Sequence, residues 1–188
     1  MTIAVLALQG AFVEHQQMLR TMGIDTFLVR NLQDWHLPKD ALVIPGGEST
    51  AIMRILRDEC LLMPVHEAIV QGLPVFGTCA GLIMLDGEHL GTMDIQVRRN
   101  AYGRQLGSFH ASGDFRGIGT VPMTFIRAPY IENVGPRVEI LSVLDGHIVA
   151  ARQENQLVTA FHPELTSDTR VHRYFARMVR ESIVHPQT

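Results

Sequence analysis

The sequence predicts an α/β protein of three layers, in which a mostly parallel central sheet is flanked by helices and joined by a small antiparallel part. Two observations lead to this fold class. In the first half of the 188-residue chain, short continuous apolar runs alternate with segments of helical periodicity, as is typical of parallel strands buried on both faces. The second half is richer in glycine and polar residues, and turn signals join its apolar runs, which favours antiparallel strands.

Four strands and three connecting helices are expected in the first half. The strands are the apolar runs 3–8, 26–29, 41–44 and 73–76. The helices are expected over residues 12–22, from Glu48 or Ser49 onward, and over 64–72. The segment 31–39 has no clear periodicity, and we expect it to be irregular.

The second half is expected to contribute several short strands and a terminal helix. The strands are 93–97, 123–126, 138–143, 147–152 and 157–161, and an amphipathic helix follows from about 168 to 184. Asp145 and Gly146 form a typical hairpin turn between two of these strands. No linker, repeat or low-complexity tract interrupts the sequence, so we expect one domain over residues 1–188.

Composition excludes several classes of function. The net charge of −3 provides no basic field to attract nucleic acid or anionic lipid. The apolar N-terminal run lacks the basic flank of a signal peptide, and no run approaches the length of a transmembrane helix. Two cysteines are too few for a disulfide framework. These features favour a cytoplasmic protein without nucleic-acid or membrane partners.

A nucleophile is expected at Cys79. This residue stands between Gly77 and Gly81, directly after an apolar strand and before a helical segment, in the arrangement of a nucleophile elbow. Larger side chains at the two glycines would clash in so tight a turn. A position at a helix N-terminus also favours the thiolate form of cysteine. An isolated cysteine is more often a buried structural residue, but the glycine frame at a strand end favours a reactive thiol.

The best candidate for the base is His162, which ends the last expected strand. Glu164 lies two residues further on and projects to the same side of an extended segment, so it can orient the imidazole. The sequence therefore predicts a Cys-His-Glu triad. Most of the other histidines lie near charged or loop residues and are expected to be exposed; they are His15, His36, His66, His89, His147, His172 and His185.

A glycine-rich turn, residues 45–50, follows the third strand and leads into a helix. Such a turn can bind an anion or an oxyanion, and the pattern of a P-loop or a dinucleotide fingerprint is absent. The loops at Gln9, at 45–49 and at 77–81 all follow strands of one parallel sheet, so we expect them to form one site. No group of residues has the spacing of metal ligands, and Cys60 is expected to have no role.

Three motifs together resemble the class I (triad) glutamine amidotransferases, which have a flavodoxin-like fold. They are Pro-Gly-Gly-Glu-Ser-Thr at 45–50, Phe-Gly-Thr-Cys-Ala-Gly at 76–81 and Phe-His-Pro-Glu-Leu at 161–165. Three further segments, at 8–10, 99–105 and 125–129, resemble the PdxT/SNO family within that class, the glutaminase subunits of pyridoxal 5′-phosphate synthase. The resemblance extends from about residue 3 to residue 184.

The resemblance implies a role for each matching residue. Cys79 would attack the side-chain amide of L-glutamine and form a γ-glutamyl thioester, with His162 as acid and base and Glu164 as its orienting group. Backbone N–H groups of Ala80 and of the turn at Gly46 and Gly47 would bind the oxyanion. The residues implied to contact glutamine are Gly47, Glu48, Ser49, Arg99, Ile126 and Arg127. Surface positions are expected for Arg98, Arg104 and Arg116.

The resemblance also implies a partner and no cofactor. The ammonia would pass to a separate (β/α)8-barrel synthase subunit in a hetero-oligomer, and docking would complete the oxyanion hole near Gln9. The sequence departs from the family pattern at Ala160, where serine is commoner, and in a shortened segment after Asp86. The triad is unaffected by either change, but the second could alter the docking surface.

Three alternatives remain open. The chain could be a class I glutaminase that serves another synthase, of the imidazole glycerol phosphate or anthranilate type, although the segments 99–105 and 125–129 argue against it. It could be a cysteine peptidase or chaperone-like protein, but those usually carry histidine where Ala80 follows the nucleophile. It could also be a catalytically silent regulatory subunit, which an intact set of Cys79, His162 and Glu164 disfavours.

Overall fold

The computed structural model describes residues 1–99 and 107–184. Within these residues, nine strands form one sheet in the order β2-β1-β3-β4-β11-β10-β8-β5, with β9 paired to β10. Its parallel half consists of β1 (Thr2–Leu6), β2 (Asp25–Val29), β3 (Ala41–Ile44), β4 (Val75–Thr78) and β11 (Gln156–Thr159). The middle strands β1, β3, β4 and β11 are almost entirely buried, because helices cover both of their faces.

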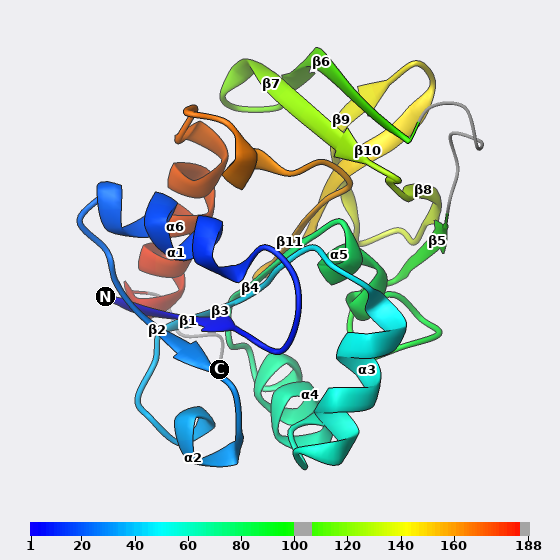
Figure 1. The fold of residues 1–188 in the computed structure, drawn as a ribbon. Coiled ribbons are helices and arrows are strands. Elements are labelled where there is room, and N and C mark those ends of the chain that lie inside the picture. The colour runs from blue at the N-terminus through cyan, green and yellow to red at the C-terminus, as the bar shows by residue number, and fades with distance from the viewer. Residues whose placement is uncertain (100–106, 185–188) are drawn as a thin grey trace.

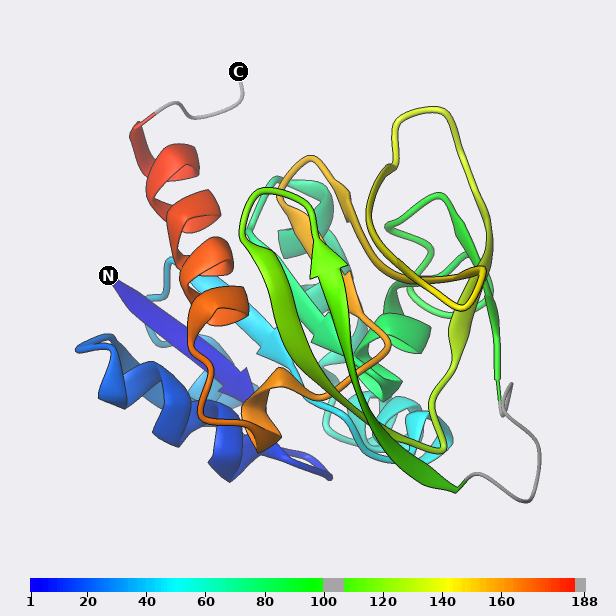
Figure 2. The ribbon, with the colours of Figure 1, turned by 90° about the horizontal axis from the view of Figure 1, so that it is seen from above.

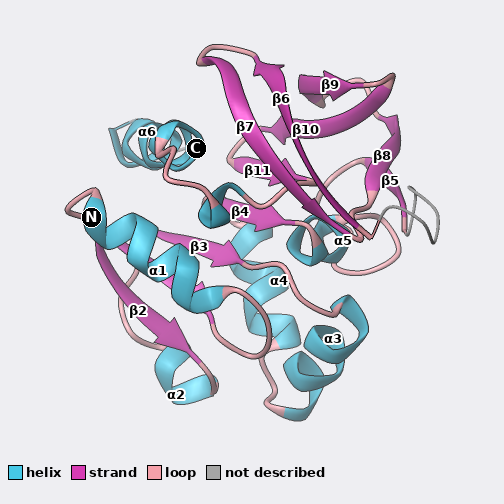
Figure 3. Ribbon diagram, turned by 45° about the horizontal axis from the view of Figure 1, so that its top comes forward, coloured by secondary structure: helices cyan, strands magenta, loops and turns pink. Residues whose placement is uncertain are grey.

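The helices form the two outer layers of the fold. Helices α1 (Phe12–Thr21) and α6 (Arg170–Val184) cover one face of the sheet, and α3 (Ser49–Asp58), α4 (Leu62–Val70) and α5 (Ala80–Leu85) cover the other (Figures 1 and 3). The aromatic ring of Phe76 in β4 packs against that of Phe175 in α6, with 5.4 Å between their centroids. The predicted three-layer α/β fold is therefore confirmed. No helix of the described chain has the length and apolarity needed to span a bilayer.

The antiparallel part extends the sheet beyond β11. It contains β5 (Ile95–Arg98), β8 (Tyr130–Val134), β9 (Glu139–Leu144) and β10 (His147–Gln153). A separate hairpin of β6 (Ser108–Phe115) and β7 (Gly119–Ile126) lies across the sheet from the layer of α3 and α4 (Figure 2). The expected turn at Asp145 and Gly146 joins β9 to β10, and both residues have positive φ angles of 49° and 79°.

Two strands and one α-helix of the structure were not predicted from the sequence. Strands β6 and β8 are only partly buried, so polar residues interrupt the apolar pattern typical of a buried strand. The segment expected to be irregular contains the short helix α2 (Leu32–Trp35). Its N-terminus is capped by Asn31, whose side chain accepts a hydrogen bond of 2.9 Å from the Asp34 N–H.

The topology brings four loops to one edge of the sheet. The chain moves outward from β1 to β2 and then returns to β3 on the other side of β1, which makes a switch point between β1 and β3. The loops that follow β1, β3, β4 and β11 all begin at the carboxyl ends of parallel neighbours. Gln9, the turn at Gly46, Cys79 and His162 lie in these four loops, and the candidate site is built there.

Candidate active site

Cys79 sits in a strained backbone conformation between β4 and α5. Its φ and ψ are 50° and −100°, a region that non-glycine residues occupy at a cost of about 1–3 kcal/mol. The turn is tight, as predicted: a Cβ on Gly77 would lie 2.5 Å from the Gly81 carbonyl oxygen, and a Cβ on Gly81 would lie 2.0 Å from that of Ile44. The thiol is 7% exposed at the floor of a cavity. This is the geometry of a nucleophile elbow.

His162 and Glu164 meet as the sequence predicts. The Nδ1 of His162 lies 2.6 Å from Oε1 of Glu164, and both side chains are buried. The local backbone differs from the extended segment that was expected, since residues Pro163–Leu165 form a 3-10 turn and bring the carboxylate back under the imidazole. With Nδ1 facing an acceptor, Nε2 is left to face the thiol.

The electrostatics of the pair favour a charged imidazole. Burial acts to lower the pKa of His162, but hydrogen bonds and charge interactions with Cys79 and Glu164 outweigh it and raise the pKa to about 10. A histidine that holds its proton beside a thiol stabilises the thiolate. The arrangement therefore places a protonated imidazole beside the thiol, where it can deliver a proton during a reaction.

The glycine turn after β3 lies directly over the thiol and the imidazole. A Cβ on Gly46 would stand 2.3 Å from Cε1 of His162 and 3.3 Å from Cβ of Cys79, so only glycine fits. The Gly46 N–H donates to Oγ1 of Thr78 at 3.1 Å, and the Glu48 N–H donates to Oε1 of Gln9 at 2.6 Å. Because the Gly46 and Glu48 N–H groups are engaged in these hydrogen bonds, the Gly47 N–H between them is the group of this turn that can donate to an oxyanion.

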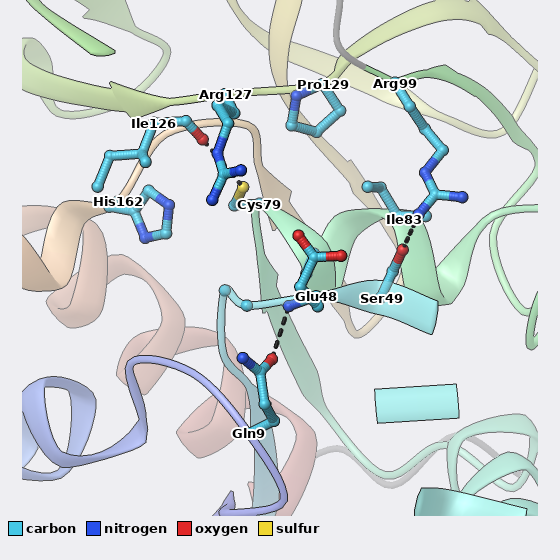
Figure 4. A pocket seen from close by; sticks show the side chains of 13 residues that line it. Gln9, Glu48, Ser49, Cys79, Ile83, Arg99, Ile126, Arg127, Pro129 and His162 are labelled. Carbon is cyan, nitrogen blue, oxygen red and sulfur yellow. Dashed lines mark hydrogen bonds between the residues drawn. The ribbon is translucent and has the colours of Figure 1, made fainter. Parts of the chain in front are cut away.

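A cavity of about 260 Å³ opens above Cys79 (Figure 4). The sheet edge contributes Gln9 and residues 46–49, the elbow contributes Cys79, Ala80 and Ile83, and the opposite wall contributes Arg99, Ile126, Arg127, Pro129 and His162. The guanidinium of Arg99 contacts the Ser49 hydroxyl at 2.5 Å. Arg127 has a positive φ of 42°, and its N–H donates to the Gly107 carbonyl oxygen at 2.6 Å. The carboxylate of Glu48 and the guanidinium groups of Arg99 and Arg127 bring negative and positive charge to the cavity, which suits the ammonium and carboxylate groups of an amino acid.

The structure brings the sequence-predicted residues together. Every residue expected to contact glutamine lines the cavity, and Glu164 lies behind His162. The lining residues Ile83 and Pro129 were not expected there, although Ile83 stands one helical turn after the nucleophile. Arg98 and Arg116 are exposed and paired with glutamates, as expected for surface residues. Residues 100–106, which include Arg104 and most of one family segment, lie outside the described residues.

One expectation about histidines is wrong. Of the histidines expected to be exposed, His36 is exposed, but His15 and His172 are 0% exposed, and His66, His89 and His147 are half-buried. His15 and His172 form part of a buried polar cluster with Thr78, which accepts from Gly46 as described above. Their positions at the inner faces of α1 and α6 could have been inferred from helical periodicity, because His15 lies four residues before Leu19 and His172 three before Phe175.

Comparison with known proteins agrees with this geometry. A family model described as the SNO glutamine amidotransferase family matches residues 5–181. The chain belongs to this family. Two curated relatives, each called pyridoxal 5′-phosphate synthase subunit PdxT, are from Streptococcus pneumoniae strains CGSP14 and D39. They are 53% and 52% identical to this chain over 96% of its length and 98% and 99% of theirs.

Solved structures support the same assignment. A crystal structure described as a glutamine amidotransferase is similar with a TM-score of 0.89 and 40% identity, over 95% of this chain and 98% of that one. A putative GMP synthase component from Thermoplasma acidophilum shares the fold, with a TM-score of 0.75 at 19% identity over 98% and 96% of the two chains. In the described part of this glutamine amidotransferase, no group of three or more potential ligands is placed to hold a metal ion.

Proposed function

We propose that this glutamine amidotransferase is the glutaminase subunit of a pyridoxal 5′-phosphate synthase and that it uses Cys79, His162 and Glu164 as its triad. The observation that carries the triad is the 2.6 Å contact between His162 and Glu164 beneath a strained Cys79. The relatives named PdxT, at 52–53% identity over nearly the whole chain, support the assignment to this synthase.

The first half of the reaction forms the thioester. The Cys79 thiolate attacks the side-chain carbonyl carbon of L-glutamine, and the oxyanion accepts hydrogen bonds from the Ala80 and Gly47 N–H groups. The protonated His162 then donates its proton to the amide nitrogen as the C–N bond breaks. Ammonia leaves, and the γ-glutamyl group stays on sulfur.

The second half releases glutamate. The neutral His162 takes a proton from water, which attacks the thioester and returns the thiolate, while Glu164 holds the imidazole in one tautomer. Arg99 and Arg127 suit the α-carboxylate of the substrate, and the carboxylate of Glu48 suits its α-ammonium group. The small cavity fits a single amino acid.

The partner is proposed to be a (β/α)8-barrel synthase subunit in a hetero-oligomer, which receives the ammonia in the cytoplasm. The Glu48 N–H, bound to Gln9, lies at the open rim of the site, and docking there would complete the oxyanion hole.

Substitution of the nucleophile tests this function. With the synthase subunit present, Cys79→Ala should abolish pyridoxal 5′-phosphate formation from glutamine and leave formation from ammonium salts intact, because only ammonia release needs the thiol. Cys60→Ser, at the chain's other cysteine, which is exposed, should behave as wild type. Equal loss with both nitrogen sources would refute the role of Cys79. Activation of a different synthase in place of this one would refute the assigned partner.

A further inference from the structure

A row of buried polar side chains continues behind the triad, from Glu164 to helix α6. His15 of α1 places its Nε2 3.0 Å from Oγ1 of Thr78 and 3.4 Å from Oε2 of Glu164. Its Nδ1 lies 2.9 Å from Nε2 of His172 in α6. All four of these side chains are shielded from solvent, and His15, Thr78 and His172 are 0% exposed.

The carboxylate of Glu164 needs a donor on its second oxygen. Oε1 is bound to His162, but Oε2 has no well-aligned hydrogen bond from the described residues and is fully shielded from solvent. A buried carboxylate oxygen without a donor is costly. Among the described residues, the nitrogen placed to supply an N–H is Nε2 of His15, at 3.4 Å.

The surrounding contacts assign the proton of His15 to Nε2. Thr78 Oγ1 already accepts from the Gly46 N–H and has a second lone pair for His15. With Nε2 protonated, Nδ1 accepts from Nε2–H of His172. The remaining nitrogen, Nδ1 of His172, has no partner in the described chain and is then an unprotonated acceptor.

The opposite tautomer fails at both ends of the row. An N–H on Nδ1 of His15 would donate to His172, whose own proton would then be a buried donor with no acceptor among the described residues. At the other end, Nε2 could only accept from the Thr78 hydroxyl, and Oε2 of Glu164 would be left without a donor among the described residues. Burial lowers the pKa of both imidazoles, that of His172 to about 3, so neither carries a charge at neutral pH.

We propose that His15 is a positioning residue of the glutaminase reaction, a neutral imidazole whose Nε2–H is directed at Glu164 and Thr78. Through Glu164 it fixes the group that orients His162, and through Thr78 it fixes the hydroxyl that holds the Gly46 N–H. One side chain on α1 thus aligns the base and the oxyanion turn. The inference rests on the proposed function and deepens it.

The proposal predicts a change in pH dependence when the N–H is removed. The titratable groups that face Glu164 are His162 from its own turn and His15 from α1; Cys79 lies beyond His162, and His172 of α6 lies beyond His15. An N–H dipole stabilises the ionised carboxylate. Its loss should therefore change the electrostatics of the Glu164–His162 pair and shift the pH profile of the activity.

Two variants at one position separate positioning from packing. His15→Leu keeps a similar volume and removes the donor, whereas His15→Gln can place an amide N–H near the position of Nε2. With the synthase subunit present, we expect His15→Leu to lower kcat for glutamine hydrolysis about 10- to 100-fold, because Glu164 would lose the donor that holds it in place to orient His162. The KM for glutamine should change little, and His15→Gln should restore most of the rate.

Alkylation of the thiol gives a second readout that needs no partner. In a Cys60→Ser background, the rate of Cys79 alkylation by iodoacetamide is followed against pH, and His15→Leu should shift its profile whereas His15→Gln should not. The control is a substitution of the exposed His36, which lies outside the buried row behind Glu164 and should change neither profile.

Three outcomes distinguish failure of the inference from failure of the proposed function on which it rests. Wild-type kcat and wild-type pH profiles in a folded His15→Leu variant would overturn the positioning role, as would a kcat loss that His15→Gln does not restore. Absence of glutamine hydrolysis in the wild-type complex would instead overturn the proposed function itself. Circular dichroism and thermal unfolding establish that each variant is folded before it is assayed.

Discussion

In the mechanism proposed above, the residues of the site divide into those that react and those that hold the substrate. Cys79 and the protonated His162 would carry the chemistry, while Glu48 and the arginines Arg99 and Arg127 line the cavity where the charged groups of the ligand would lie. Arg99 is held by the Ser49 hydroxyl at the start of α3, so its guanidinium is oriented before any ligand binds. Chemistry and binding are therefore separable by mutation.

Arg99→Ala should weaken binding without disabling the triad. Loss of a charge-assisted hydrogen bond to the α-carboxylate should raise the KM for glutamine by about tenfold to a hundredfold and change kcat less. The neighbouring Arg98 is exposed and paired with Glu132, so Arg98→Ala is the matched control and should keep the wild-type KM. Steady-state kinetics measure both, and an equal effect of the two substitutions would contradict the role of Arg99.

At the scale of elements, close backbone contact between β3, β4 and α5 shapes the elbow. Helix α5 begins at Ala80 and passes so near β3 that Gly81 leaves no room for a side chain beside Ile44. The motif around Cys79 predicted this contact, since glycine on either side of a nucleophile is required only in a tight strand-to-helix turn.

Gly81→Ala should destabilise the fold itself. The added Cβ would lie 2.0 Å from the Ile44 carbonyl oxygen, a backbone atom that cannot move aside, and overpacking of this kind costs about 1–3 kcal/mol or more. The melting temperature should fall by several degrees. In the control Gly87→Ala the nearest atom would be 4.0 Å away, so a similar loss there would contradict the explanation.

Elements were predictable from sequence where burial was complete. The strands β1, β3 and β4 appear as apolar runs because both faces are covered, and α1 and α6 follow from their periodicity. Strand β6 was not predicted because exposed residues interrupt its apolar pattern and because it contains Gly113, which makes room for the side chain of Met123. The triad and the residues expected to contact glutamine could be predicted from motifs. The contact between His15 and His172 could not, because the two lie on different helices and no motif links them.

At the scale of the whole molecule, two neutral histidines in the core link stability to pH. Their lowered pKa values mean that the folded chain binds fewer protons than the unfolded chain below about pH 6.5. Stability should therefore fall as the pH falls from 6.5 toward 3. His162 has a raised pKa of about 10, so its contribution is complete below pH 6.5 and is lost only as the pH rises toward 10.

Urea unfolding at pH 6.5 and pH 5 measures this effect. Each buried histidine should contribute a slope of up to about 1.4 kcal/mol per pH unit, and His172→Leu should make the dependence shallower. Substitution of His36, which is exposed, should leave the slope unchanged. An unchanged slope in His172→Leu would show that this histidine is not neutral in the fold.

The central claim is that Cys79 carries the γ-glutamyl group. The most direct measurement is intact mass of the Cys60→Ser chain after acid quenching during turnover of glutamine with the synthase subunit present. We predict a mass increase of one γ-glutamyl group, mapped to Cys79 by peptide analysis and absent in Cys79→Ala. Glutamate release that continues in Cys79→Ala would contradict the claim.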